Sequence, residues 1–267
     1  MTTPPSRSVA AARHRSWPWC LRCSGIALDL GSARTRVWTS GRRTILDVPT
    51  ITLPGVHATC PVQRGAIVDT PGTARMLDRL LGHRLPRAGR PLLILTTPVL
   101  GGVAYRAEAL TVPTARAVAV AAGADLGRPL LVVDIGAHLT EVTLLVDGAV
   151  TDARCTALGT SDLDSHTPPA RIIDAVAVMV SGMLDQDHTS QTLDALRRGP
   201  LLAGGGALEP DITGHLTDRL HASLHPVLAP HTAAVRGAAR LLQAAHAHPS
   251  AIAIAVTGAD ADAAHYL

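Results

Sequence analysis

The 267-residue sequence contains no Phe and no Lys, and only three Trp and two Tyr supply aromatic side chains. Leu, Val, Ile and Ala must therefore build the core, and apolar residues make up 47% of the chain. The net charge of +3 is small, and the basic residues are dispersed except at the N-terminus. A nucleic-acid-binding domain concentrates far more positive charge on one face, so we expect no nucleic-acid partner. No apolar run approaches the ~20 residues that cross a bilayer. The length suits one large or two small domains.

The four cysteines are also few, and they are not spaced as a disulfide framework. Reduced thiols in a cytoplasmic protein are therefore expected. Cys20 and Cys23 could form half of a zinc site, but neither a second cysteine pair nor a histidine cluster completes it.

Residues 130–142 predict a buried strand that runs into a tight turn. Four consecutive apolar residues, Leu-Leu-Val-Val, leave the strand no polar face, which indicates an α/β sheet covered on both sides. Asp134 stands at the end of this strand, where a carboxylate can hold a hydrated Mg²⁺. Gly136 lets the backbone pass close to a phosphate group.

Residues 25–38 repeat this design. An apolar strand again delivers an aspartate, Asp29, and a glycine, Gly31, into a turn with small hydroxyl residues, and a second strand follows. Two such hairpins predict a duplicated fold that holds phosphate from both sides.

A third segment, residues 201–208, places Gly204, Gly205 and Gly206 after a short strand and before a helix. Successive glycines permit close backbone approach to a flat or phosphorylated ligand, and the N-terminus of the next helix favours negative charge. Each segment taken alone is more often only a turn.

The order of the three segments resembles the actin-like ATPase superfamily, and most closely the MreB (rod shape-determining) family of bacterial actins. The resemblance continues between them. Residues 62–69 look like the segment that enters the family's first long helix, 112–119 like its Glu-Pro helix, and 230–238 like its closing helix. The resemblance covers most of residues 24–243.

The resemblance implies a duplicated actin-like (ribonuclease H-like) α/β fold, with two lobes that each contain a mixed sheet flanked by helices. It divides the chain into a basic N-terminal tail (1–24), a first lobe (25–128), a second lobe (129–246) and a C-terminal tail (247–267). It also implies ATP with Mg²⁺, the metal held by Asp29 and Asp134. The positions expected to contact the nucleotide are Asp29, Gly31, Ser32, Ala33, Thr35, Asp134, Gly136, Ala137, His138, Thr140, Gly204, Gly205, Gly206 and Ala207.

The chain departs from the family by its short connections. The family inserts small subdomains, called IB and IIB, before residue 62 and between 159 and 168, and this sequence has room for neither. Without these subdomains less of a nucleotide's surface would be buried, so weaker nucleotide affinity is expected. Filament formation in the family's usual geometry is also in doubt.

The water-handling residues of the family are altered as well. Val112 stands where the family has a glutamate, and a hydrocarbon does not polarise water. Leu139 replaces a hydroxyl in the phosphate turn, so ATP binding with weak or absent hydrolysis is expected. His138 either contacts a phosphate oxygen or is an ordinary surface residue of the turn.

These features favour an MreB-like, nucleotide-binding cytoskeletal protein that acts in cell shape or cell-wall synthesis. Its expected partners are itself, other MreB-like proteins and the cell-wall synthesis machinery. It would be cytoplasmic, or peripheral at the inner membrane face if Arg and Trp in residues 1–24 bind lipid. The alternative is a nucleotide-free pseudo-ATPase that serves as a scaffold or interaction module. A small-molecule kinase fits poorly, because the first lobe lacks substrate-binding insertions.

Hydrophobic periodicity predicts the remaining elements. A third strand is expected over residues 44–53, and another strand after Pro91. Helices are expected over 71–85, 168–184 and 232–246, and a further helix ends near Leu224.

Overall fold

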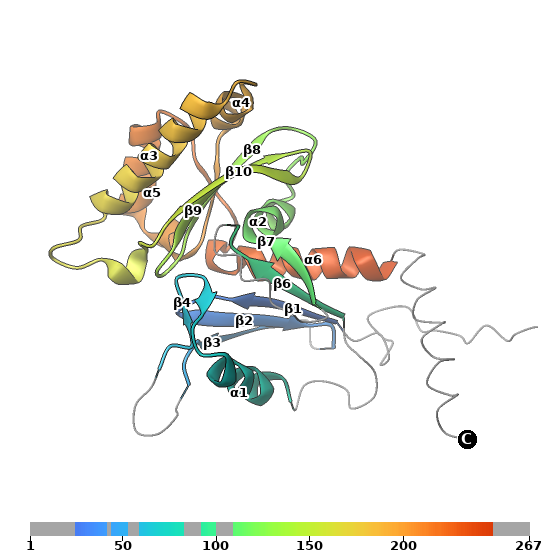
Figure 1. The fold of residues 1–267 in the computed structure, drawn as a ribbon. Helices are drawn as coiled ribbons and strands as arrows, with labels where there is room; N and C mark the ends of the chain where they lie inside the picture. The colour runs from blue at the N-terminus through green and yellow to red at the C-terminus, as the bar shows by residue number, and fades with distance from the viewer. Residues whose placement is uncertain (1–24, 42–43, 53–58, 83–91, 100–108, 248–267) are drawn as a thin grey trace, which may run out of the picture.

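The computed structural model describes residues 25–41, 44–52, 59–82, 92–99 and 109–247. These residues form two five-stranded mixed sheets with helices against them (Figure 1), so the predicted α/β class is confirmed. The predicted N-terminal tail, Cys20 and Cys23, and the predicted C-terminal tail apart from Ala247 lie outside the described residues. Cys60 and Cys155 are free thiols. No helix in the described part of the chain is long and apolar enough to cross a bilayer.

The two sheets share one topology. In each, three antiparallel strands come first in the chain, and two further strands are added in parallel beside the first. The first sheet contains β1 (Gly25–Leu30), β2 (Arg34–Thr39), β3 (Ile45–Pro49), β6 (Leu92–Thr97) and β7 (Ala109–Pro113) in the order β3-β2-β1-β6-β7. The second contains β8 (Leu130–Ile135), β9 (Thr140–Val146), β10 (Ala149–Thr156), β11 (Leu201–Ala203) and β12 (His225–Pro226) in the order β10-β9-β8-β11-β12. The fold is thus duplicated, as the two Asp-x-Gly hairpins predicted.

The central strands β1 and β8 are buried on both faces. Along β8, Leu131 and Val133 pack under α3 (Ala170–Gln186) and α5 (Pro210–Leu220), whereas Val132 faces α2 (Thr114–Ala122). Successive side chains of a strand point to opposite faces, so an unbroken apolar run is what two covering layers require.

The predicted helices are present, but their first and last residues differ from the predicted ones by a few positions. The helix predicted over 71–85 is α1 (Thr70–Leu81), which begins where the Asp69 carboxylate accepts a hydrogen bond from the Gly72 backbone N–H at 2.8 Å. The helix predicted to end near residue 224 is α5 and ends earlier, at Leu220. The amphipathic α4 (Gln191–Arg198) was not predicted.

Two helices lie between the sheets, α2 and α6 (Ala233–Ala247). Val118 of α2 packs on the second sheet, although α2 follows the last strand of the first sheet in the chain. Val235 and Leu242 of α6 pack on the first sheet, although α6 comes late in the chain. The lobes therefore exchange helices, and α2 and α6 pack together so closely that a Cβ on Gly237 would overlap the carbonyl oxygen of Ala117.

The connections at the positions of the small subdomains are short. The third strand ends at Pro49 rather than near residue 53, and the described part of 50–61 contains only an isolated bridge between Thr52 and Thr59. Residues 157–169 contain one turn of 3-10 helix, η1 (Thr160–Asp162). A two-stranded hairpin, β4 (Val62–Gln63) and β5 (Ala66–Ile67), follows the first connection.

Candidate functional site: a cleft between two equivalent strands

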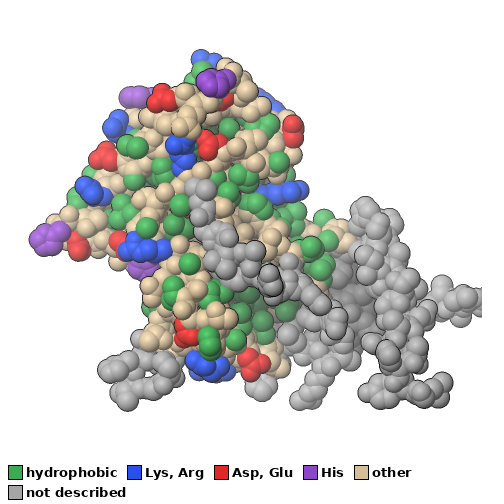
Figure 2. All heavy atoms as spheres, in the orientation of Figure 1, with side chains coloured by type: hydrophobic (Ala, Val, Ile, Leu, Met, Phe, Trp, Pro, Cys, Tyr) green, Lys and Arg blue, Asp and Glu red, His purple; other side chains and the backbone are tan. Residues whose placement is uncertain are grey.

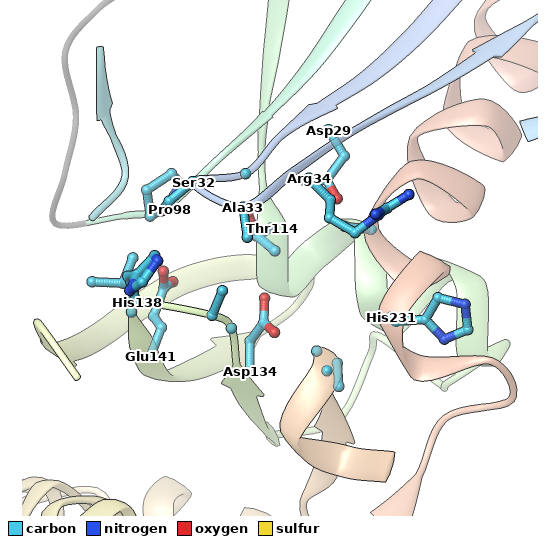
Figure 3. Close-up of a pocket in the computed structure, with 18 of the residues that line it drawn as sticks. Asp29, Ser32, Ala33, Arg34, Pro98, Thr114, Asp134, His138, Glu141 and His231 are labelled. Carbon is cyan, nitrogen blue, oxygen red and sulfur yellow. The ribbon is translucent and has the colours of Figure 1, made fainter. Parts of the chain in front are cut away.

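A cavity of about 340 Å³ lies between the two sheets, where β1 and β8 end. Asp29 from β1 and Asp134 from β8 line it from opposite walls, and their side chains point toward one another across the cavity (Figure 3). Because β1 and β8 occupy equivalent positions in the two sheets, the duplication itself brings the two carboxylates together.

Each aspartate is followed by the same kind of tight turn. The backbone N–H of Gly31 donates to the carbonyl of Arg34 at 3.1 Å, and that of Gly136 donates to the carbonyl of Leu139 at 2.8 Å. The tips of these turns line the cavity. They carry Ser32, Ala33, Ala137 and His138.

The glycine segment after β11 closes another side of the cavity. Gly204 has φ +83°, a conformation that side chains other than glycine rarely adopt, and its N–H donates to the carbonyl of Pro230 at 3.2 Å. A Cβ at this position would overlap the Asp134 carboxylate and the carbonyl of Ile135. A Cβ on Gly205 would meet no atom within 4 Å, because this residue faces the open cavity.

The charged forms of the two aspartates in the cleft are disfavoured by their surroundings. Burial raises the pKa of Asp134 to about 7, and repulsion from Glu141 and Asp29 adds to this effect, while Arg36 opposes it. Burial also raises the pKa of Asp29, although the Arg36 guanidinium and the Thr96 hydroxyl stabilise its charged form. Positive charge from a ligand would relieve this repulsion.

Glu141 is a third carboxylate of the cleft, and the sequence predictions missed it. It lies on β9 directly opposite Asp134, and the residue is only 5% exposed. Its Oε1 accepts a hydrogen bond from the Thr143 hydroxyl at 2.8 Å and one from the Val99 backbone N–H at 3.5 Å. The signal in the sequence was an acidic residue within an otherwise buried strand.

Known structures share the fold that forms this cleft. MreB5 of Spiroplasma citri, solved bound to ADP, superposes with a TM-score of 0.72 at 14% identity, over 85% of this chain and 98% of that chain. MamK, solved as a double helical filament, gives 0.68 at 14% identity, over 82% and 98%. The ethanolamine utilization protein EutJ from Carboxydothermus hydrogenoformans gives 0.56 at 16% identity, over 81% and 89%. The chain has the actin-like fold. Neither a protein-family model nor a curated protein sequence matches it, so the three-dimensional similarity carries the assignment.

Most of the residues predicted from the MreB resemblance do line the actin-like cleft. These are Asp29, Gly31, Ser32, Ala33, Asp134, Gly136, Ala137, His138, Gly204 and Gly205. Their contact with a nucleotide stays a prediction.

Four predicted positions do not line the cleft. Thr35 is fully buried, with its hydroxyl hydrogen-bonded to that of Thr50 at 2.8 Å. Thr140 is fully buried too, and its hydroxyl donates to the Leu158 carbonyl at 2.8 Å. Both threonines alternate along their strands with residues that line the cleft, so their side chains point to the opposite face. Gly206 and Ala207 belong to the 3-10 helix η2 (Gly205–Leu208), which turns them into the second lobe.

His138 lines the actin-like cleft but is held by a carboxylate. Its Nδ1 lies 3.1 Å from an oxygen of Asp162. Arg64, at the tip of the β4–β5 hairpin, approaches the same oxygen at 3.5 Å and donates to the Ala157 carbonyl. This contact joins the first lobe to the second at one end of the cleft, and no sequence pattern indicated it.

The residues present fit a magnesium ion that arrives with a phosphate ligand. No group of three or more His, Cys, Asp or Glu side chains in the described ranges forms a complete metal site. Mg²⁺ is commonly bound through one or two carboxylates together with substrate phosphates. Asp29 and Asp134 supply such a pair, and both carry pKa values raised by burial.

Proposed function

We propose that this protein binds an adenine nucleotide with Mg²⁺ in the cleft between its lobes and self-associates as an actin-like cytoskeletal protein. The proposal is supported chiefly by one relationship, the opposed carboxylates of Asp29 and Asp134 at the ends of equivalent strands. MreB5, which shares the fold, has been solved with ADP, and MamK has been solved as a filament.

The cleft would hold the nucleotide by its phosphates. The turns at Gly31 and Gly136 bring backbone N–H groups and the Ser32 hydroxyl to the cavity, and Gly205 leaves space for a ring system beside His231. When bound, Mg²⁺ would neutralise phosphate charge between Asp29 and Asp134. Hydrolysis would be slow, because Val112 and Leu139 replace the family's water-handling residues.

The cellular role proposed is in cell shape or cell-wall synthesis, with other MreB-like proteins or the wall-synthesis machinery as partners. The protein would act in the cytoplasm, and the basic residues 1–24 would bring it to the inner face of the membrane. On the described surface, charges of both signs are interspersed with apolar side chains (Figure 2).

Isothermal titration calorimetry with ATP and Mg²⁺, followed by sedimentation of the same samples, tests both parts of the proposal. Asp134→Ala should abolish the Mg²⁺ dependence of binding, and nucleotide-dependent pelleting should disappear with it. Asp174→Ala is the control, because Asp174 lies on the outer helix α3 with its side chain 64% exposed. Wild-type protein that gives no heat at millimolar nucleotide would disprove the nucleotide part.

The second candidate is a scaffold without nucleotide chemistry. The ion pair between Arg36 and Asp29 favours it, because it occupies one of the two carboxylates from within the chain. This candidate predicts partner binding that is unchanged by Asp29→Ala and by Asp134→Ala.

A further inference from the structure

Glu141 is the carboxylate of the cleft whose position the proposed binding of Mg²⁺ does not explain. Asp29 is paired with Arg36, and Asp134 faces Asp29 across the cavity. Glu141 forms no ion pair with any residue in the described ranges, yet it is nearly inaccessible and aimed at the cavity. Keeping such a carboxylate in a core costs stability, so a functional reason is worth seeking.

The hydrogen bonds of Glu141 fix its orientation and leave one oxygen available. Both the Thr143 hydroxyl and the Val99 N–H donate to Oε1. Thr143 belongs to the same strand, whereas Val99 follows β6 of the first lobe, so the carboxylate bridges the two lobes. Within the described residues no donor bonds to Oε2, which can therefore accept from a water molecule in the cleft.

The order of residues along the cleft places Glu141 at one end. In Figure 3, Glu141, His138 and Pro98 lie together, His231 lies at the opposite side, and Asp134 stands between them. The Gly204 turn is bonded to Pro230, the neighbour of His231. A nucleotide with its base near Gly205 and its phosphates between the two turns therefore directs its terminal phosphate toward Glu141.

We infer that Glu141 is the general base for hydrolysis of the terminal phosphoryl group, in place of the side chain that Val112 cannot provide. The inference rests on the proposed nucleotide binding. The water oxygen bonds to the terminal phosphorus, and the bond from that phosphorus to the bridging oxygen breaks. The electron pair leaves with the nucleoside diphosphate. Glu141 takes the proton from the water and later releases it to solvent, so inorganic phosphate and the nucleoside diphosphate are the products.

The position of Glu141 suits this role, because two hydrogen bonds hold its carboxylate at the cleft. Burial raises the pKa of its carboxyl group above the ordinary value for glutamate, and the Thr143 and Val99 hydrogen bonds only partly offset this. The strand position supplies rigidity, because a base must be held within hydrogen-bond reach of the water it activates.

Phosphate release under single-turnover conditions, with full-length protein and Mg-ATP, tests the inference. Glu141→Gln keeps the shape and the acceptor atom for Thr143 but removes the base, so the rate should fall by about 10²–10⁴. The matched control is Glu209→Gln, since Glu209 is exposed at the start of α5. Thr143→Val, which only loosens the carboxylate, should slow release by about tenfold.

Nucleotide binding separates a chemical role of Glu141 from a structural one. Calorimetry with a non-hydrolysable ATP analogue should give the same affinity for Glu141→Gln and wild type within about threefold, because a group that acts only in the transition state does not contribute to ground-state binding.

Two results would overturn the inference. If the analogue binds but Glu141→Gln releases phosphate as fast as wild type, or if neither releases any, Glu141 is not the base and the proposed binding survives. If wild-type protein does not bind the analogue at all, the proposed function fails and this inference fails with it.

Discussion

The guanidinium of Arg36 lies 3.5 Å from the carboxylate of Asp29, and its Nε lies 3.2 Å from Asp47. Arg36 is on β2 directly opposite Asp29 on β1, so the antiparallel register places both side chains on the same face. Only 15% of the Arg36 side chain and 18% of the Asp29 side chain are exposed. The cleft therefore contains an internal cation, and a metal ion at Asp29 would share this carboxylate with Arg36.

Replacing Arg36 by Met should destabilise the ligand-free protein by about 1–3 kcal/mol at pH 7, because the buried Asp29 carboxylate loses its partner. Urea denaturation measures this change. The double variant Arg36→Met with Asp29→Asn should recover most of the loss, since no unpaired charge remains. A double variant as unstable as the single one would show that Arg36 acts through packing rather than through its charge.

The raised pKa of Asp134 predicts a dependence of stability on pH. Between about pH 4 and 7 the folded state holds the Asp134 proton more tightly than the unfolded state does, so ionisation lowers stability as the pH rises. Asp134→Asn should thus stabilise the ligand-free protein on the order of 2 kcal/mol at pH 8, less than the full shift implies because the cleft admits water. The gain should shrink at pH 5. Equal gains at both pH values would contradict this account.

The two neighbouring glycines after β11 should respond oppositely to alanine. Gly204→Ala should lower stability by about 2–4 kcal/mol, because the φ of +83° and overlap with Asp134 both oppose a Cβ. Gly205→Ala should leave the melting temperature near that of wild type, since a Cβ there meets open space. It should nevertheless weaken nucleotide binding by about tenfold, which corresponds to 1.4 kcal/mol of lost contact. Unchanged affinity in calorimetry would place the ligand elsewhere.

Gly237 is where α6 meets α2, and an alanine there should force the two helices apart. A Cβ would overlap the Ala117 carbonyl, so Gly237→Ala should destabilise the protein by about 2–4 kcal/mol. Gly214→Ala is the matched control, because Gly214 lies inside α5 and its Cβ would meet nothing within 4 Å. That variant should gain about 0.5–1 kcal/mol from helix propensity. Thermal denaturation of both variants decides the point.

The sequence determined the repeated unit of this protein. The apolar run before Asp134 and the one before Asp29 each specify a strand covered on both faces, and the following glycines specify the same tight turn. These are local properties, because strand periodicity and turn chemistry depend on residues a few positions apart. The central strands and the principal helices could therefore be predicted from local patterns, and most of the cleft residues from the MreB resemblance.

Tertiary structure alone decided what depends on residues distant in the chain. α2 packs on the second sheet and α6 on the first, with close contact between them at Gly237, and neither helix carries a local signal for its partner. The pairing of Arg36 with Asp29 and the placement of Glu141 opposite Asp134 depend on strand register. Thr35 and Thr140 point into the core for the same reason, since a shift of one position reverses the face on which a side chain lies.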